Sequence, residues 1–91
     1  MKFEWDENKA KSNVVKHGIT FSEAVTIFAD PYLLFTEDSQ HSQEEEREWA
    51  IGVAENGSLI VVVFTIRDET IRIISARKAT RNERKQYEQG I

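Results

Sequence analysis

The chain has 91 residues, enough for one domain that buries about two thirds of its unfolded surface, and the absence of cysteine excludes disulfide bonds and thiolate metal sites. A hydrophobic fraction of 40% suffices for a core and a charged fraction of 31% indicates a soluble surface, while the net charge of −4 by itself disfavours nucleic-acid binding. No apolar run has the length of a membrane span and the N-terminus has no signal-peptide pattern, so we expect residues 1–91 to form a single cytoplasmic domain.

The N-terminal residues predict a short strand followed by a polar helix. Residues 2–5 alternate polar and aromatic side chains, which is typical of an edge strand. Asp6 is a good N-cap for a helix over residues 7–16, and Gly18 supplies the left-handed residue at which such helices end.

A second helix is predicted to begin after Thr20. Thr20 and Glu23 have the spacing of a capping box, in which each side chain accepts a hydrogen bond from the other residue's backbone. Apolar residues then recur at the spacing of a buried helical stripe, at Phe21, Ala24, Val25 and Phe28. We expect Asp30-Pro31 to end this helix.

Four strands are predicted to follow, separated by a polar loop at residues 37–46 and by two tight connections: 32–36, 47–54, 59–66 and 70–76. The run at 59–66 is continuous, apolar and β-branched, so we expect both of its faces to be covered. Asn56-Gly57 is a strong hairpin signal because both residues favour positive φ, and Asp68-Glu69 forms a second tight connection. Strands joined this closely form an antiparallel meander.

The last predicted element is a helix that starts at about Arg81, behind a second capping box at Thr80 and Glu83. The fold class is therefore α+β, with two N-terminal helices, an antiparallel sheet of about four strands and a C-terminal helix. Helices are expected on both faces of the sheet.

Charge is divided unevenly along the chain. Residues 67–91 contain seven basic and four acidic side chains, whereas residues 1–66 contain five basic and twelve acidic ones. Such a chain can present a cationic surface to phosphate while its acidic remainder keeps it soluble. The alternative is a basic helix that is merely solvated.

Several short strings give the chain a resemblance to the BrnT toxin family. They run in the same order and at nearly the same spacing from Lys2 to Glu88: Phe3-Glu4-Trp5-Asp6, Lys16-His17-Gly18, Asp30-Pro31, Glu46-Arg47, and Ile71-Arg72-Ile73-Ile74-Ser75-Ala76-Arg77-Lys78-Ala79-Thr80 with Glu83 and Tyr87. The resemblance implies a type II toxin with a RelE-like fold that cleaves RNA without a metal and thereby inhibits translation. It also implies neutralisation by a BrnA-like ribbon-helix-helix antitoxin, in a 2:2 heterotetramer that binds operator DNA only through the antitoxin and represses its own operon.

Three arginines are the residues expected to meet the phosphate. Metal-free RNA cleavage needs a base for the 2′-OH, cations for the pentacoordinate phosphorane and an acid for the departing 5′-oxygen. Arg67, Arg72 and Arg77 lie on or next to adjacent strands, and a guanidinium binds two phosphate oxygens without deprotonating near neutral pH. We assign Arg67 and Arg77 to catalysis and Arg72 to RNA binding. A structural ion pair of Arg72 with Glu48 or Glu69 is the alternative.

The base and acid are not resolved by the sequence. Candidates that match the family's pattern are Lys16, His17, Glu46 and Tyr87, whereas His41 lies in the polar loop and is expected to face solvent. Each could instead have a purely structural role: a helix C-terminal contact for His17, a surface position for Lys16, an ion pair for Glu46, and packing of the last helix for Tyr87. The cations Arg47, Lys78 and Arg81 are predicted to bind RNA.

No metal or cofactor is expected, because the two histidines and the scattered carboxylates lack the spacing of metal ligands and no glycine-rich phosphate loop is present. The remaining aromatic residues are interpreted as core. Two other function classes stay open: a module that binds RNA or protein without chemistry, and a structural partner whose sheet and last helix dock another small protein.

Overall fold

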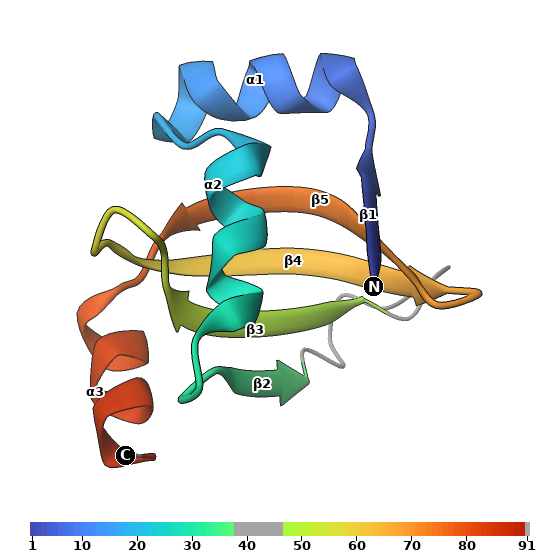
Figure 1. Ribbon diagram of the computed structural model, residues 1–91. Coiled ribbons are helices and arrows are strands. Elements are labelled where there is room, and N and C mark those ends of the chain that lie inside the picture. The colour runs from blue at the N-terminus through green and yellow to red at the C-terminus, as the bar shows by residue number, and fades with distance from the viewer. Residues whose placement is uncertain (38–46, 91) are drawn as a thin grey trace.

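The computed structural model describes residues 1–37 and 47–90, which form a sheet with helices on both faces (Figure 1). The elements in chain order are β1 (Lys2–Trp5), α1 (Glu7–His17), α2 (Phe21–Val25), the 3₁₀ helix η1 (Thr26–Ala29), β2 (Leu34–Glu37), β3 (Glu48–Val53), β4 (Leu59–Arg67), β5 (Thr70–Lys78) and α3 (Arg81–Gln89). In the described part of the chain, no helix is both long and apolar enough to span a membrane.

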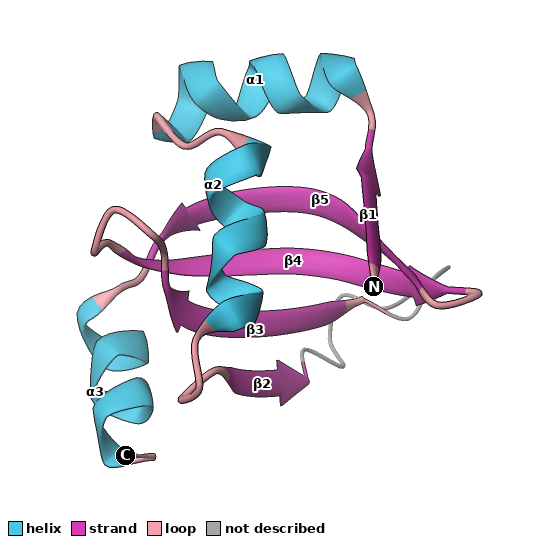
Figure 2. Ribbon diagram, in the orientation of Figure 1, coloured by secondary structure: helices cyan, strands magenta, loops and turns pink. Residues whose placement is uncertain are grey.

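The sheet has five strands in the order β1-β5-β4-β3-β2 (Figure 2). Strands β2 to β5 form the expected antiparallel meander. The prediction of about four antiparallel strands was wrong in one respect, because β1 is a fifth strand and pairs in parallel with β5. This pairing sets Phe3 opposite Ile71 and Trp5 opposite Ile73, so both aromatic side chains join the core under the helices.

Both faces of β4 are buried from Leu59 to Thr65, as the continuous apolar sequence predicted, but Ile66 at the end of that run is 54% exposed. On the face covered by α1, α2 and η1, which we call the helix face, Ile60, Val62 and Phe64 are fully buried. On the opposite face, the main buried cluster consists of Ile51, Leu59, Val61 and the α3 residue Tyr87. Helix α3 therefore covers one end of this second face, at the end of the sheet where β5 stops (Figure 1).

A β-bulge in β5 changes which side chains share a face. Val63 pairs with Ser75 but Phe64 pairs with Ile73, so Ile74 is an extra residue without a direct partner on β4. Strict alternation would place residue 77 on the same face as the buried Ile71 and Ile73. The bulge reverses the alternation, so Ala76 is buried under the helices and Arg77 emerges on the opposite face.

Helix α1 is attached to the sheet through the buried side chain of Asn13. Its Nδ2 donates to the carbonyl oxygens of Ile19 and Ala76, each at 2.9 Å, and its Oδ1 accepts from the backbone N–H of Ala76 at 3.0 Å. Strand β1 follows β5 only as far as Ile73, so Asn13 provides hydrogen bonds to the edge of β5 beyond that point. The last turn of α1 is thereby held beside the C-terminal end of β5.

The helix ends follow the sequence with one exception. Asp6 caps α1, Gly18 ends it at φ 69°, and Thr80 caps α3 within a complete capping box. Thr20 caps α2 as expected, but the Glu23 carboxylate accepts a hydrogen bond from the Asn56 side chain. It thereby links α2 to the β3–β4 turn.

The two hairpin turns differ in backbone conformation. At Asn56-Gly57 only the glycine has positive φ, at 91°, so this turn differs from the type predicted. Asp68 and Glu69 both have positive φ, at 48° and 67°, which is the requirement of a type I′ turn. Two residues with side chains therefore occupy left-handed conformations between β4 and β5.

Candidate functional site

The three arginines expected to meet phosphate lie on one face of the sheet. Arg72 is opposite Thr65 and Arg77 is opposite Val61, while Arg67 follows Thr65 at a spacing of two along β4. Cross-strand partners and alternate residues of a strand share a face, so all three side chains emerge opposite α1 and α2. We call this surface the arginine face. It arises because the β5 bulge brings Arg77 to the side of Arg72.

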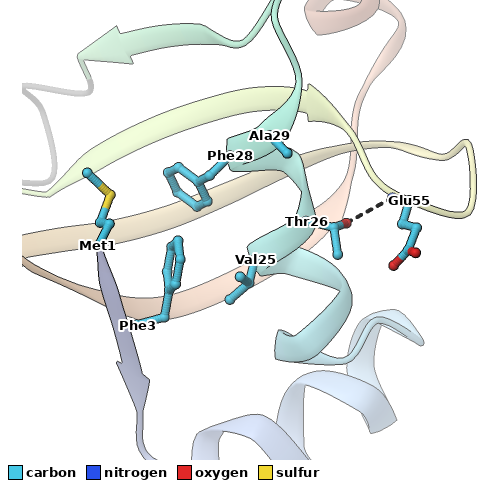
Figure 3. Close-up of a pocket in the computed structure, with 7 residues that line it drawn as sticks. All are labelled: Met1, Phe3, Val25, Thr26, Phe28, Ala29 and Glu55. Atoms are coloured by element: carbon cyan, nitrogen blue, oxygen red, sulfur yellow. Dashed lines mark hydrogen bonds between the residues drawn. The ribbon is translucent and has the colours of Figure 1, made fainter.

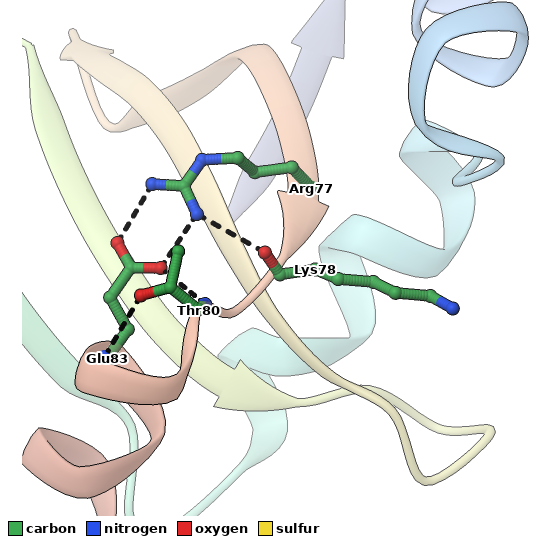
Figure 4. Close-up of polar contacts among 4 residues, drawn as sticks. All are labelled: Arg77, Lys78, Thr80 and Glu83. Atoms are coloured by element: carbon green, nitrogen blue, oxygen red, sulfur yellow. Dashed lines mark hydrogen bonds and ion pairs between the residues drawn. The ribbon is translucent and has the colours of Figure 1, made fainter.

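Arg77 is held by the carboxylate of Glu83 in a bidentate ion pair (Figure 4). Nη1 donates to Oε1 at 2.7 Å and Nη2 donates to Oε2 at 2.8 Å, while Nη1 also donates to the Lys78 carbonyl at 3.2 Å. The Arg77 side chain is 29% exposed and that of Glu83 is 18% exposed. The pair is therefore shielded from much of the solvent that weakens surface ion pairs.

The same ion pair shifts the protonation equilibria of both groups. The hydrogen bonds from Arg77 lower the pKa of Glu83 from 4.5 to about 2, against an opposing effect of burial and with help from the Thr80 backbone. The Glu83 hydrogen bonds raise the pKa of Arg77, so the guanidinium stays charged throughout the working range of an enzyme. Both groups are ionised near neutral pH.

Trp49 contacts the same guanidinium from β3. Arg77 Cζ lies 5.3 Å from the centroid of the Trp49 ring, a cation–π distance. Sequence reasoning treated Trp49 as core and Glu83 only as a capping residue, and so missed both neighbours of Arg77. The capping-box spacing was the available signal, because it fixes Glu83 at the start of the helix that follows Arg77.

Arg72 is paired with Glu4 of β1, with Nη1 at 2.7 Å from Oε2. The predicted alternative partners were Glu48 and Glu69, but Glu4 is the residue that the parallel β1–β5 register places directly across from Arg72. Glu48 lies opposite Phe64 and therefore on the helix face. The side chains of Arg72 and Glu4 are 38% and 51% exposed, so solvent reaches this pair.

The other predicted RNA-binding cations do not all lie on the arginine face. Arg67 is exposed at the end of β4, beside the Asp68-Glu69 turn. Lys78 is opposite Ile60, and its side chain extends away from Arg77 (Figure 4). Arg81 is exposed in the first turn of α3, and Arg47 is exposed immediately before β3.

Lys16 and His17 are exposed in the last turn of α1. They follow Asn13 by three and four residues, so they lie one helical turn beyond the hydrogen bonds to Ala76. They therefore lie near the end of β5 that carries Arg77, but on the helix side of the sheet, whereas the Arg77 side chain emerges on the other face. Glu46 and His41 lie outside the described residues.

Tyr87 occupies the packing position that the sequence left as an alternative. Its side chain is buried with Ile51, Leu59 and Val61, and its hydroxyl donates to Asp30 Oδ2 at 2.6 Å. Burial and the Asp30 carboxylate raise the pKa of Tyr87 to about 12. The phenol therefore attaches α3 to the turn after η1.

The Asp30 carboxylate is correspondingly well satisfied. Its Oδ2 also accepts from the Val53 backbone at 2.9 Å, and its Oδ1 accepts from the Tyr32 backbone at 2.9 Å. Burial acts to raise the pKa of Asp30, but these hydrogen bonds outweigh it and the pKa is lowered.

An apolar pocket of about 610 Å³ lies on the other side of the molecule, between β1 and the α2–η1 segment (Figure 3). Its lining is apolar except for two polar residues, and consists of Met1, Phe3, Val25, Thr26, Phe28, Ala29 and Glu55.

No group of three or more side chains of the metal-ligating types is positioned to hold an ion within residues 1–37 and 47–90. The arginine face is therefore the candidate site for phosphate chemistry.

Comparison with known proteins adds a family and a structure. Residues 5–83 match the model of a family described as the ribonuclease toxin BrnT of type II toxin–antitoxin systems. The chain is also similar to the crystal structure of the Brucella abortus ribonuclease toxin BrnT, with a TM-score of 0.68 and 27% identity over 89% of this chain and 99% of that one. No curated protein matches the chain.

Proposed function

Since the chain belongs to the BrnT family of ribonuclease toxins of type II toxin–antitoxin systems, we propose that it is a metal-independent endoribonuclease that binds and cleaves RNA on its arginine face. The observation that carries this proposal is the presence of Arg67, Arg72 and Arg77 on one face of a rigid sheet. Strands hold charged groups in place more firmly than loops do, as stabilisation of a transition state requires.

The proposed reaction is an internal phosphoryl transfer. The 2′-oxygen of the RNA loses its proton to a base and attacks the adjacent phosphorus, and the 5′-oxygen of the next nucleotide leaves with a proton from an acid. The products are a 2′,3′-cyclic phosphate and a 5′-hydroxyl end, so no water or metal enters this step. Arg77 stabilises the phosphorane, while Arg67 and Arg72 hold the flanking phosphates.

We assign the base and acid to the remaining candidates, Lys16, His17 and Glu46, without choosing among them. Tyr87 is left out because its hydroxyl is buried and donates to Asp30. Arg47, Lys78 and Arg81 are proposed to contact RNA at the periphery.

The family also implies an antitoxin, for which we propose a BrnA-like ribbon-helix-helix protein. In the proposed 2:2 heterotetramer, the antitoxin covers the arginine face with acidic or apolar groups and carries all contacts with operator DNA. Release of the toxin would inhibit translation through loss of RNA.

The test is cleavage of RNA by the purified chain in EDTA. We expect cleavage products from the native protein and much slower cleavage by Arg77→Ala, with unchanged circular dichroism. Arg84→Ala is the matched control, because Arg84 is an exposed cation of α3 that takes no part in the Arg77–Glu83 ion pair. Salt-dependent RNA binding without any cleavage would instead identify a binding module, the second candidate function.

A further inference from the structure

The guanidinium of Arg77 has a defined set of donors that remain for a ligand. Arginine has five N–H groups, one on Nε and two on each terminal nitrogen. Glu83 takes one from Nη1 and one from Nη2, and the Lys78 carbonyl takes the second from Nη1. Within residues 1–37 and 47–90, no acceptor contacts the Nε–H or the second N–H of Nη2. These two groups lie along one edge of the guanidinium.

That edge has the geometry to bind a phosphodiester. Two parallel N–H donors on a planar group match two non-bridging oxygens of one phosphate. Glu83 approaches the guanidinium end-on, that is, between Nη1 and Nη2. The edge formed by Nε and Nη2 is left for a ligand, because Nε lies away from the carboxylate (Figure 4).

Glu83 itself is fixed in two ways. Its Oε1 accepts from the Thr80 backbone N–H at 2.8 Å, as part of the capping box that begins α3. Helix α3 is in turn attached through the Tyr87–Asp30 hydrogen bond. The Trp49 ring lies against the guanidinium, so Arg77 is restrained by this ring, by Glu83 and by the Lys78 carbonyl.

The pair is close to neutral overall, which limits what Glu83 can contribute by charge. A carboxylate beside the cation reduces its attraction for an approaching phosphate. Glu83 can therefore raise the rate of cleavage only by orienting Arg77, and correct orientation matters most in the transition state.

We propose that Glu83 is a positioning residue that holds Arg77 end-on, so that the Nε/Nη2 edge receives two non-bridging oxygens of the phosphate under attack. The proposal rests on the proposed RNA cleavage for its catalytic consequence, and it assigns Glu83 a role beyond helix capping.

The variant Glu83→Gln separates positioning from capping. Glutamine at this position of a capping box still accepts from the Thr80 N–H, so α3 keeps its cap. The amide has one acceptor oxygen, so it cannot accept from both terminal nitrogens of Arg77. Glu88→Gln is the matched control, because it removes the same charge from an exposed position of the same helix.

Cleavage kinetics give the first measurement. For Glu83→Gln we expect kcat to fall by about 10- to 100-fold. KM should stay unchanged or decrease because a negative charge has been removed, and Glu88→Gln should behave as the native protein. The double variant Arg77→Ala/Glu83→Gln should cleave no more slowly than Arg77→Ala alone, because Glu83 acts through Arg77. A kcat equal to that of the native protein, or additive losses in the double variant, would overturn the proposal.

A second measurement does not depend on cleavage. The ¹⁵N–¹H resonance of Arg77 Nε, assigned by its loss in Arg77→Ala, should shift when a single-stranded DNA oligonucleotide is added, and this shift should be lost in Glu83→Gln. A native protein that shows the resonance shift but cleaves no RNA would refute the proposed function and leave the positioning role standing. An Nε resonance that is insensitive to the oligonucleotide would refute the positioning role, whether or not RNA is cleaved.

Discussion

The hydrogen bond between Tyr87 and Asp30 determines what the phenol can do. The sequence offered Tyr87 as a proton donor or as a packing residue, because it could not place position 87 relative to residue 30. The fold brings them to 2.6 Å and buries the ring against β3 and β4. A phenol whose pKa is about 12 and whose proton already points at a carboxylate is a structural donor at neutral pH.

We therefore predict that Tyr87→Phe lowers stability and leaves cleavage intact. Loss of the hydroxyl should reduce the free energy of unfolding by about 1–2 kcal/mol, since Asp30 keeps only its backbone donors. Urea denaturation measures the change. If Tyr87 were the general acid, kcat would fall by about 100-fold or more while substrate binding persisted.

The Glu83–Arg77 pair should also appear in the dependence of stability on pH. The pKa of Glu83 falls from 4.5 to about 2 on folding, so the unfolded chain binds its proton first as the pH is lowered. The stabilisation is therefore complete above about pH 4.5 and is lost as the pH falls toward 2.

We expect native protein and Glu83→Gln to differ by about 2 kcal/mol in unfolding free energy at pH 7, and by about half of that or less at pH 3. Urea denaturation at a series of pH values measures this difference, with Glu88→Gln as the control. A difference that stays constant from pH 7 to pH 3 would show that the carboxylate is not stabilised by folding.

At the scale of elements, the sequence predicted each helix and the meander but not the bulge in β5. Periodicity identifies a strand, yet an extra residue such as Ile74 leaves no local mark, because it is an isoleucine like Ile71 and Ile73 and suits a regular strand equally well. Whether Arg77 shares a face with Arg72 depends on this one residue. The parallel pairing of β1 was also invisible, since alternation at residues 2–5 shows which side chains are buried but not which strand they join.

The Asp68-Glu69 turn shows how pairing of the strands overrides local preference. Both residues adopt positive φ because a two-residue connection between twisted strands requires it. A side chain in the left-handed region costs about 1 kcal/mol. Asp68 and Glu69 therefore hold backbone strain next to Arg67.

We predict that Glu69→Gly stabilises the protein by about 1 kcal/mol and raises Tm by about 4–8 °C. The reverse experiment is Gly18→Ala, at a nearly equal φ of 69° with nothing within 4 Å of the added methyl, which should destabilise by a similar amount. Differential scanning calorimetry measures both variants. A fall in Tm for Glu69→Gly would mean that its side chain contributes more than its backbone costs.

For the molecule as a whole, the basic and acidic parts of the sequence are only partly separated in the folded structure. The basic C-terminal third supplies the three arginines that define the arginine face, as its composition suggested. The acidic remainder is not kept apart, since Glu4 reaches Arg72 through the parallel β1–β5 pairing. Composition cannot reveal such a pair because it depends on register. The acid that restrains Arg72 is 68 residues away in sequence.

This arrangement predicts opposite effects for the two partners of the exposed ion pair. Binding of an uncleavable 2′-O-methyl RNA should weaken in Arg72→Gln. The slope of the logarithm of the binding constant against the logarithm of the salt concentration should become shallower by about 0.7, the value for one phosphate contact on a single strand. Glu4→Gln should instead strengthen binding by about threefold, because Arg72 no longer shares its charge with a carboxylate. Glu55→Gln removes the same charge at the pocket on the helix face and should change neither quantity. Fluorescence anisotropy between 50 and 200 mM salt, about the range over which such contacts respond, measures all three. If Glu4→Gln and Glu55→Gln strengthened binding equally, net charge rather than the arginine face would govern RNA affinity.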